Sequence, residues 1–128
     1  GWLNTENSMR REDALQKAVA KMLDYSGLVW QHSPNEGQRT ARQGKHAKDM
    51  GLKSGFPDIA IYDKGANGEP LAIELKAPNA KGYLPKPGAI QLAWHDKLRR
   101  CGWRVEVCWT FDEVLALLKE HYPSTFGR

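Results

Sequence analysis

The chain has 128 residues, of which 41% are hydrophobic and 27% charged, and its formal net charge at pH 7 is +4. This length and composition are typical of one soluble globular domain with a sizeable core. No apolar run approaches the ~20 residues of a membrane-spanning helix, and no signal peptide is visible, so we expect no membrane association. Cys101 and Cys108 are too few for a disulfide framework or a zinc site. We therefore expect free thiols and a cytoplasmic location.

The predicted elements alternate between helices and strands. In chain order they are a helix at 11–25, a strand at 28–32, a short basic helix at 38–50, strands at 56–62 and 70–76, a helix at 89–101, a strand at 103–109, and a last helix capped by Thr110 and Glu113. The helix at 89–101 is predicted to carry Ile90, Trp94, Leu98 and Cys101 on one apolar stripe. Residues 1–9 are expected to be a loose lead-in, and residues 10–128 a single domain. The order α-β-(α)-β-β-α-β-α predicts an α/β fold, with a mixed sheet covered by helices.

The central hairpin, GFPDIAIYDKGANGEPLAIELKA over residues 55–77, carries three charges in two otherwise apolar strands. Because side chains alternate along a strand, each strand has one aliphatic face and one face that bears charge. The turn length requires the residue numbers of cross-strand partners to sum to 132 or 134, so that like faces pair. Asp58 then lies opposite Glu74 or Lys76, and all three side chains meet at one end of the hairpin.

Two carboxylates this close repel each other, and the pKa of one of them rises unless a cation lies between them. Mg²⁺ prefers oxygen ligands and commonly uses one or two carboxylates. Lys76 points to the same face as Glu74, where it could stabilise an anionic transition state. A plain salt bridge between Lys76 and a neighbouring carboxylate is the alternative interpretation.

Glu12 continues the apolar stripe of the first helix, because it lies three residues before Leu15, which lies four before Val19. A carboxylate in line with a buried stripe is costly unless it is paired or binds a metal. The alternative is an acidic residue of the first turn that favours the helix dipole and still reaches water.

Basic residues are concentrated directly before the hairpin. The segment 37–54 contains five of them against the single acid Asp49: Arg39, Arg42, Lys45, Lys48 and Lys53. Such a segment is either a solvated face or a phosphate-contacting arm. Lys81 and Lys86 in the proline-rich loop after the hairpin could hold a second phosphate or merely keep the loop soluble.

Five pieces of the chain, in order, resemble one nuclease family. They are REDALQKAV, QHSPNEGQR, AKDMGLKSGFPDIAIY, LAIELKAPNAKG and IQLAWHDKLRRCGWRVEVCW. Together they are similar to the virus-type replication-repair nucleases (VRR-Nuc) of the PD-(D/E)XK superfamily, and specifically to the small stand-alone members of bacteria and phages. Pro57–Asp58 corresponds to the PD motif and Glu74-Leu75-Lys76 to ExK.

The resemblance implies roles for individual residues. Asp58, Glu74 and the backbone carbonyl of Leu75 would bind Mg²⁺, which Mn²⁺ could replace. Lys76 would be the catalytic lysine, Glu12 would orient water, and Gln91 would lie at the edge of the site. The run before Gln91 is Pro-Gly-Ala-Ile, where relatives often have Ser-Pro-Glu, so Gln91 is the residue whose match is weakest.

The function that follows is a metal-dependent endonuclease selective for DNA structure, with four-way (Holliday) junctions as the leading substrate. Two symmetric cuts in a junction call for a homodimer, and five tryptophans in 128 residues could supply an interface. Three alternatives remain: a DNA-binding protein without turnover, a nuclease for flaps or single-stranded ends, and a small-molecule hydrolase. The paired acids argue against binding without turnover, and the absence of a nucleophile elbow argues against the small-molecule hydrolase.

Overall fold

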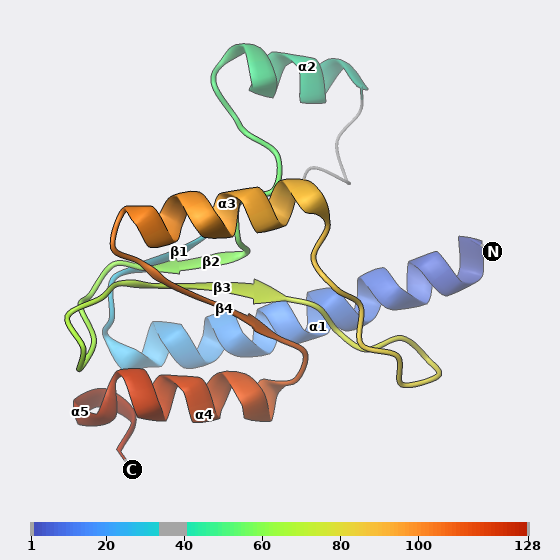
Figure 1. The fold of residues 1–128 in the computed structure, drawn as a ribbon. Helices are drawn as coiled ribbons and strands as arrows, with labels where there is room; N and C mark the ends of the chain where they lie inside the picture. Colours follow the sequence, from blue (N-terminus) through green and yellow to red (C-terminus); the bar gives the residue numbers. More distant parts are fainter. Residues whose placement is uncertain (1, 34–40, 128) are drawn as a thin grey trace.

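The computed structural model describes the backbone of residues 2–33 and 41–127, and side chains from residue 10 onward within these ranges (Figure 1). Its elements are α1 (Trp2–Ser26), β1 (Trp30–His32), α2 (Ala41–Asp49), β2 (Ile59–Ile61), β3 (Leu71–Leu75), α3 (Ala89–Arg100), β4 (Arg104–Cys108), α4 (Phe111–His121) and α5 (Pro123–Phe126). The predicted order of helices and strands is confirmed, and the short basic helix forms.

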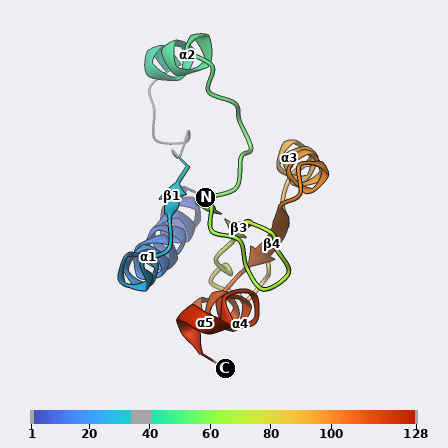
Figure 2. The same ribbon diagram turned by 90° about the vertical axis from the view of Figure 1, so that its left-hand side faces the viewer.

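The four strands form one mixed sheet in the order β1-β2-β3-β4. The first two pairings are antiparallel, whereas β3 and β4 are parallel, with α3 as the crossover between them. Helix α3 covers one face of the sheet, and α1 and α4 cover the other (Figures 1 and 2). The result is three layers with the sheet in the middle.

The hairpin register settles one choice that the sequence left open. Ile59 pairs with Ile73 and Ile61 with Leu71, so cross-strand residue numbers sum to 132. The aliphatic faces of both strands pack against α1 and α4 in the larger apolar core, where Val19 is fully buried. The opposite, alanine-bearing face lies under α3.

Helix α3 is turned differently from the prediction. We expected Ile90, Trp94, Leu98 and Cys101 to form its inward stripe, but Ile90 is 62% exposed and Cys101 is also exposed. The buried residues of α3 are His95 and Leu98, with Trp94 packed partly against the sheet. The rotation has a physical reason: α3 covers the face that bears Glu74, so polar side chains of the helix turn inward to meet that carboxylate.

Helix α1 begins at Trp2, so the loose lead-in expected over residues 1–9 is wrong for residues 2–9, which continue the helix. At the other end of the chain, the predicted cap of α4 is confirmed: the Glu113 backbone N–H donates to Thr110 Oγ1 (3.1 Å), and Glu113 Oε1 accepts from the Thr110 N–H (3.0 Å).

Helix α2 stands apart from the three layers in both views (Figures 1 and 2). None of its residues is buried. Its chain continues through residues 50–58 to the start of β2, so the projecting helix is joined directly to the segment that bears Asp58.

Both cysteines are free thiols, Cys101 at the surface and Cys108 in the core. Among the described helices, none combines the length and the apolar character that crossing a lipid bilayer requires.

Candidate active site

Two acidic side chains meet where the central hairpin opens. Extending the observed register by one residue places Asp58 opposite Glu74, one of the two arrangements that the sequence predicts. Asp58 Oδ2 accepts a hydrogen bond of 2.6 Å from the backbone N–H of Leu75. Because the N–H and C=O of one strand residue point to the same edge, the Leu75 carbonyl also faces the side of Asp58.

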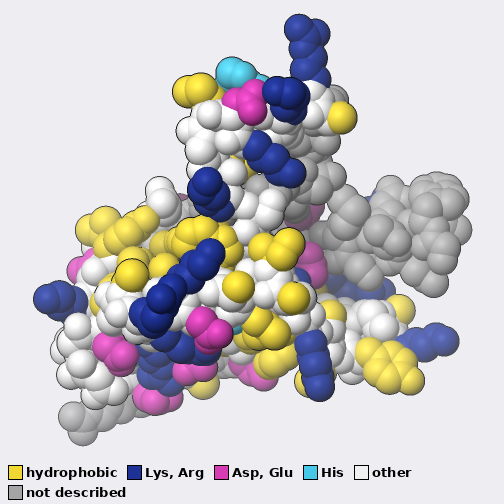
Figure 3. Space-filling model, turned by 45° about the horizontal axis from the view of Figure 1, so that its top comes forward, with side chains coloured by type: hydrophobic (Ala, Val, Ile, Leu, Met, Phe, Trp, Pro, Cys, Tyr) yellow, Lys and Arg dark blue, Asp and Glu magenta, His cyan; other side chains and the backbone are white. Residues whose placement is uncertain are grey.

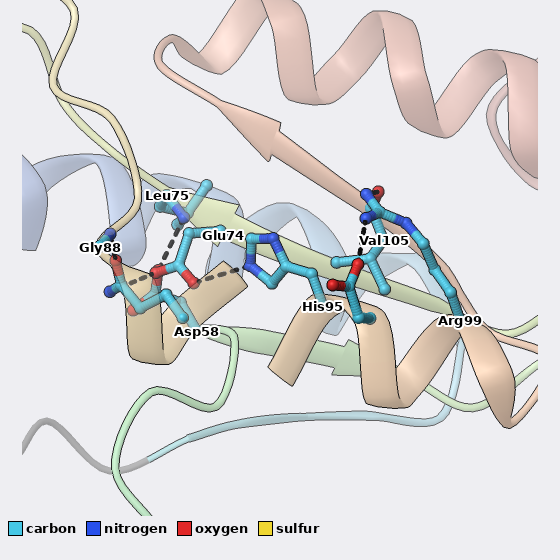
Figure 4. Close-up of polar contacts among 9 residues, drawn as sticks. Asp58, Glu74, Leu75, Gly88, His95, Arg99 and Val105 are labelled. Carbon is cyan, nitrogen blue, oxygen red and sulfur yellow. Dashed lines mark hydrogen bonds and ion pairs between the residues drawn. The ribbon is translucent and has the colours of Figure 1, made fainter. Parts of the chain in front are cut away.

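Glu74 is almost fully buried, with 2% of its surface exposed, and α3 reaches both of its carboxylate oxygens (Figure 4). Gln91 Nε2 donates to Glu74 Oε2 at 3.3 Å, and His95 Nε2 lies 3.3 Å from Glu74 Oε1. Gln91 also accepts from the Gly88 N–H at the start of α3 (2.9 Å), so its side chain is fixed at both ends. The structure therefore places Gln91 against the predicted metal ligand despite its unusual preceding sequence.

Burial and the neighbouring Asp58 dominate the electrostatics of Glu74. The pKa of Glu74 rises from an ordinary 4.5 to about 8, first because burial removes water and then because Asp58 is close and hydrogen-bonded to it. The charge of Lys76 opposes this rise. A cation that binds this poorly solvated carboxylate would displace its proton, which would be released to solvent.

Glu12 and Lys76 belong to the same cluster. The pKa of Glu12 is raised, mainly because the side chain is partly buried. The charge of Lys76 opposes this rise, and the charge of Asp58 adds to it. Lys76 thus lies near two acids, yet it forms no ion pair with any side chain of the described residues. The alternative in which Lys76 is one half of a salt bridge is not realised among these residues.

An open cavity of about 360 Å³ lies over the cluster. Its lining comes from α1, β1 and the hairpin: Glu12, Asp13, Gln16, Lys17, His32, Asp58 and Leu75. The half-buried Glu12 therefore faces the same space as Asp58, as its place in the helical stripe predicted. The cavity is lined mainly by polar side chains, and it opens onto Asp58 of the paired acids.

Two histidines of the site escaped the sequence analysis. His32 lines the cavity, and its Nδ1 lies 2.9 Å from the Asp58 backbone carbonyl. His95 is buried against Glu74. His95 could have been found by its spacing, because it lies one helical turn after Gln91. His32 could not, because only the β1–β2 register brings it beside Asp58.

The segment before Asp58 approaches α3 closely. Gly55 has φ +90°, and a Cβ built there would lie 2.7 Å from Ile90 Cγ2 and 3.1 Å from the Ile90 carbonyl. Both the backbone conformation and the space therefore require glycine. The next residue, Phe56, packs edge-on against Trp94 with ring centroids 5.4 Å apart.

The predicted DNA-binding residues are spread around this site. Arg42, Lys45 and Lys48 are on α2, and Lys53 is on the segment that leads to Asp58; all four are exposed or partly exposed. Figure 3 shows Lys and Arg side chains gathered on the projecting α2. Lys81 and Lys86 lie on the loop after β3. Arg39 lies outside the described residues.

The donor set fits a hard divalent cation. Among the described residues, no three His, Cys, Asp or Glu side chains form a ready metal cluster. The predicted set, however, consists of two carboxylates and a backbone carbonyl, and the raised pKa of Glu74 beside Asp58 favours positive charge between the two acids. Oxygen ligands of this number, completed by water, suit Mg²⁺ better than zinc.

The metal-free protein is expected to lose stability as the pH rises from 6.5 to 8. Over this range the folded state keeps the proton on Glu74, whose pKa is about 8, while the unfolded state has already released it above 4.5. One proton bound more tightly by the folded state costs about 1.4 kcal/mol of stability per pH unit gained. His95, whose pKa is lowered, acts in the opposite direction only below its ordinary value of 6.5.

Thermal unfolding in the presence of a chelator measures this effect. Glu74→Gln carries no titrating proton and should remove most of the decline between pH 6.5 and 8. A wild-type melting temperature that rises over this range would contradict the assigned protonation of Glu74.

Comparisons with known proteins agree with the geometry. The model of the VRR-NUC domain family matches residues 10–111. A solved structure described as a VRR_NUC domain protein superposes with a TM-score of 0.66 at 21% sequence identity, over 87% of each chain, and so shares the fold. No curated protein sequence matches significantly. Since the family model covers most of the chain, including Glu12, Asp58 and Glu74, this protein belongs to the VRR-NUC family.

Proposed function

We propose that this VRR-NUC domain is a Mg²⁺-dependent endonuclease that hydrolyses phosphodiester bonds in branched DNA, with four-way junctions as its leading substrate. Membership of the family supports a nuclease-type activity. The observation that carries the proposal is the position of Asp58 directly opposite the buried Glu74 in the hairpin, with Glu12 and Lys76 close by.

Each residue of the cluster has a distinct part in the proposed reaction. Asp58, Glu74 and the Leu75 carbonyl would hold the cation, which would supply Lewis-acid activation of a water molecule and of the scissile phosphate. Glu12, across the cavity from the hairpin, would accept a hydrogen bond from the attacking water and orient it. Lys76 would offer its ammonium group to the negative charge that grows on the phosphate.

The alternatives differ in what they need from the site. A DNA-binding protein without turnover would have no use for two adjoining acids, which repel phosphate. A small-molecule hydrolase would have no use for the exposed basic residues of α2. A nuclease for flaps or single-stranded ends would use the same site, and only a substrate panel separates it from a junction cutter.

That panel is the test of the proposed function. Four-way junction, flap, fork, splayed and linear duplex DNA are incubated with the protein, with and without Mg²⁺ or Mn²⁺. Metal-dependent cutting, fastest on the junction, supports the proposal. Faster cutting of flaps or single-stranded ends would favour the second nuclease, and binding without any cutting would favour the protein without turnover.

A homodimer is part of this proposal, because one site cuts one strand while a junction needs two symmetric cuts. The described tryptophans do not add support: Trp30, Trp94 and Trp103 pack against the two apolar clusters, and Trp109 donates to the Pro85 carbonyl (2.6 Å). Sedimentation equilibrium, free and with a junction, measures the mass. A monomer in both conditions would leave a nicking enzyme or flap cutter as the better description.

Neutralising Arg42 and Lys48 on α2 is expected to weaken binding to all DNA sequences alike. Both side chains are exposed to solvent. Lys45, in contrast, is already paired with Asp49 at 2.9 Å, in a surface ion pair that contributes little to the free energy of folding. The slope of log affinity against log salt should fall by roughly one unit for each phosphate that the variant no longer neutralises.

Fluorescence anisotropy over a range of salt concentrations measures the slope for Arg42→Gln/Lys48→Gln. The matched control is Lys64→Gln/Lys119→Gln, which removes two charges outside α2, from the β2–β3 loop and from α4. Equal slopes for wild type and the α2 variant would return this helix to the role of a solvated surface.

A further inference from the structure

His95 is a buried polar residue whose place in the site no motif explains. Among the described residues, the buried polar or charged side chains are Glu74, His95 and His121. Two of these three are in contact, since His95 Nε2 lies 3.3 Å from Glu74 Oε1 (Figure 4). The imidazole comes from the middle of α3, and it is not part of the lining of the open cavity.

Helix α3 is well placed to hold a side chain in position. Trp94 is packed against Phe56, and Ile90 lies against the backbone of Gly55, so the helix is pressed onto the segment that leads to Asp58. Leu98 anchors the following turn in the smaller apolar cluster. A group on α3 between these contacts has little freedom to move relative to the sheet.

The two residues of α3 that contact Glu74 reach different oxygens of its carboxylate. Gln91 donates to Oε2, and His95 reaches Oε1, one helical turn further along. A carboxylate held at only one oxygen can still rotate about its last torsion angle, whereas contacts at both oxygens fix its plane. A metal ligand whose plane is fixed in advance loses less freedom when the cation binds.

We propose that His95 is a positioning residue for the metal ligand Glu74: its Nε2–H donates to Oε1 and fixes the plane of the carboxylate for a divalent cation. The inference rests on the proposed metal-dependent function. An imidazole suits this task better than lysine or arginine, because a full positive charge beside Glu74 would compete with the cation. An aliphatic residue would leave a buried carboxylate oxygen without its donor.

A purely structural role is the competing explanation, in which His95 only satisfies a buried acid. The two roles differ in what they predict for metal binding at equal stability. If His95 is structural, its loss lowers the melting temperature and leaves the affinity of the folded protein for metal unchanged. If it positions Glu74, the affinity for metal falls even in variants that remain folded.

Two amide variants separate the roles. In His95→Gln the amide nitrogen can take the place of Nε2, whereas in His95→Asn the side chain is one methylene shorter and ends short of Glu74. Both are neutral and polar, so they differ mainly in reach. His95→Leu removes the donor altogether. His121→Leu is the control, because His121 is equally buried (1% exposed) but binds the Glu69 carbonyl (2.7 Å) at the turn end of the hairpin.

Mn²⁺ binding is measured by isothermal titration calorimetry on the whole chain, beside its melting temperature without metal. We expect His95→Asn and His95→Leu to bind Mn²⁺ about 10- to 100-fold more weakly than wild type. The Mn²⁺ affinity of His95→Gln should stay within about threefold of the wild-type affinity. His121→Leu should lose stability and keep wild-type affinity for Mn²⁺.

Equal affinity of the asparagine and glutamine variants would overturn the positioning role, even if DNA cleavage by the wild type depends on metal. A wild-type protein that binds no Mn²⁺ would overturn the proposed metal-dependent function, and the inference with it. Reduced cleavage by His95→Asn that is recovered at high Mn²⁺ concentration, with full activity of His95→Gln already at low Mn²⁺, would support the role independently of calorimetry.

Discussion

Asp58→Asn and Glu74→Gln are each expected to reduce DNA cleavage by at least about a thousandfold while leaving the fold intact. The two carboxylates lie opposite each other in the hairpin, and a neutral amide in place of either one removes a negative ligand from the proposed cation. A bound metal contributes several kcal/mol to stabilising the transition state, and ~4 kcal/mol corresponds to about three powers of ten in rate. Glu74→Gln should also raise the stability of the metal-free protein near neutral pH, because the folded state no longer has to keep a buried acid protonated well above its ordinary pKa of 4.5.

Single-turnover cleavage at saturating protein, together with Mn²⁺ calorimetry and circular dichroism, measures the rate, the affinity and the fold in each variant. Asp112→Asn is the matched control, since Asp112 is an exposed acid on α4, on the opposite side of the sheet from α3. Either site variant cutting at the wild-type rate would defeat the assignment of Asp58 and Glu74 as metal ligands.

Lys76→Met is expected to lower the cleavage rate by about 10²- to 10³-fold and to change metal affinity only slightly. Removing one group that stabilises developing charge typically has an effect of this size. Methionine keeps most of the apolar stem of the half-buried lysine, so packing is preserved while the charge is lost. Metal affinity should hold or rise a little, because the charge of Lys76 no longer opposes the cation beside Glu12 and Glu74.

Single-turnover rates at several Mg²⁺ concentrations distinguish a slower chemical step from weaker metal binding. Lys64→Met, which replaces a lysine of the β2–β3 loop, is the control. If Lys76→Met instead lowers the melting temperature strongly and keeps its rate, Lys76 is a structural counter-ion and has no part in the chemistry.

The sequence predicted the hairpin and its paired acids because strand alternation is a strict constraint. A slip of one residue would turn every aliphatic side chain out of the core, so only even sums of partner numbers were possible. The choice between 132 and 134 depended on distant contacts. The His121 carbonyl accepts from the Ala66 N–H (2.8 Å), so the end of α4 holds the hairpin turn in place. No local pattern encodes that interaction.

The helix α3 was predicted correctly, but its predicted inward face was wrong for a related reason. Apolar spacing alone selected Ile90 and Cys101 for the inward face, because periodicity weighs hydrophobic residues and ignores buried polar ones. The sheet beneath α3 bears Glu74, and the helix turns Gln91 and His95 toward it. Buried polar groups need partners, and this requirement overrode the hydrophobic pattern. Functional sites are where such exceptions are expected.

Helix α1 was predicted in its buried part and missed in its first turns, because residues 2–9 have no apolar periodicity that would predict a helix. The position of Glu12 was nevertheless correct, since it depends only on spacing from Leu15 and Val19. The position of His32 could not be predicted, because a strand of three residues has too little sequence pattern to indicate which residues it pairs with across the sheet.

The detached α2 divides the chain into parts that tolerate substitution to different degrees. A nine-residue helix with no buried residue contributes little to the free energy of unfolding, because such a short helix is marginal without tertiary packing. Substitutions on it therefore have little effect on folding, unlike those at Gly55 or Leu98. Since the same segment runs directly into Asp58, its side chains can change close to the proposed metal ligands without disturbing the packing of the sheet. On this view α2 is where related nucleases would be free to diverge first.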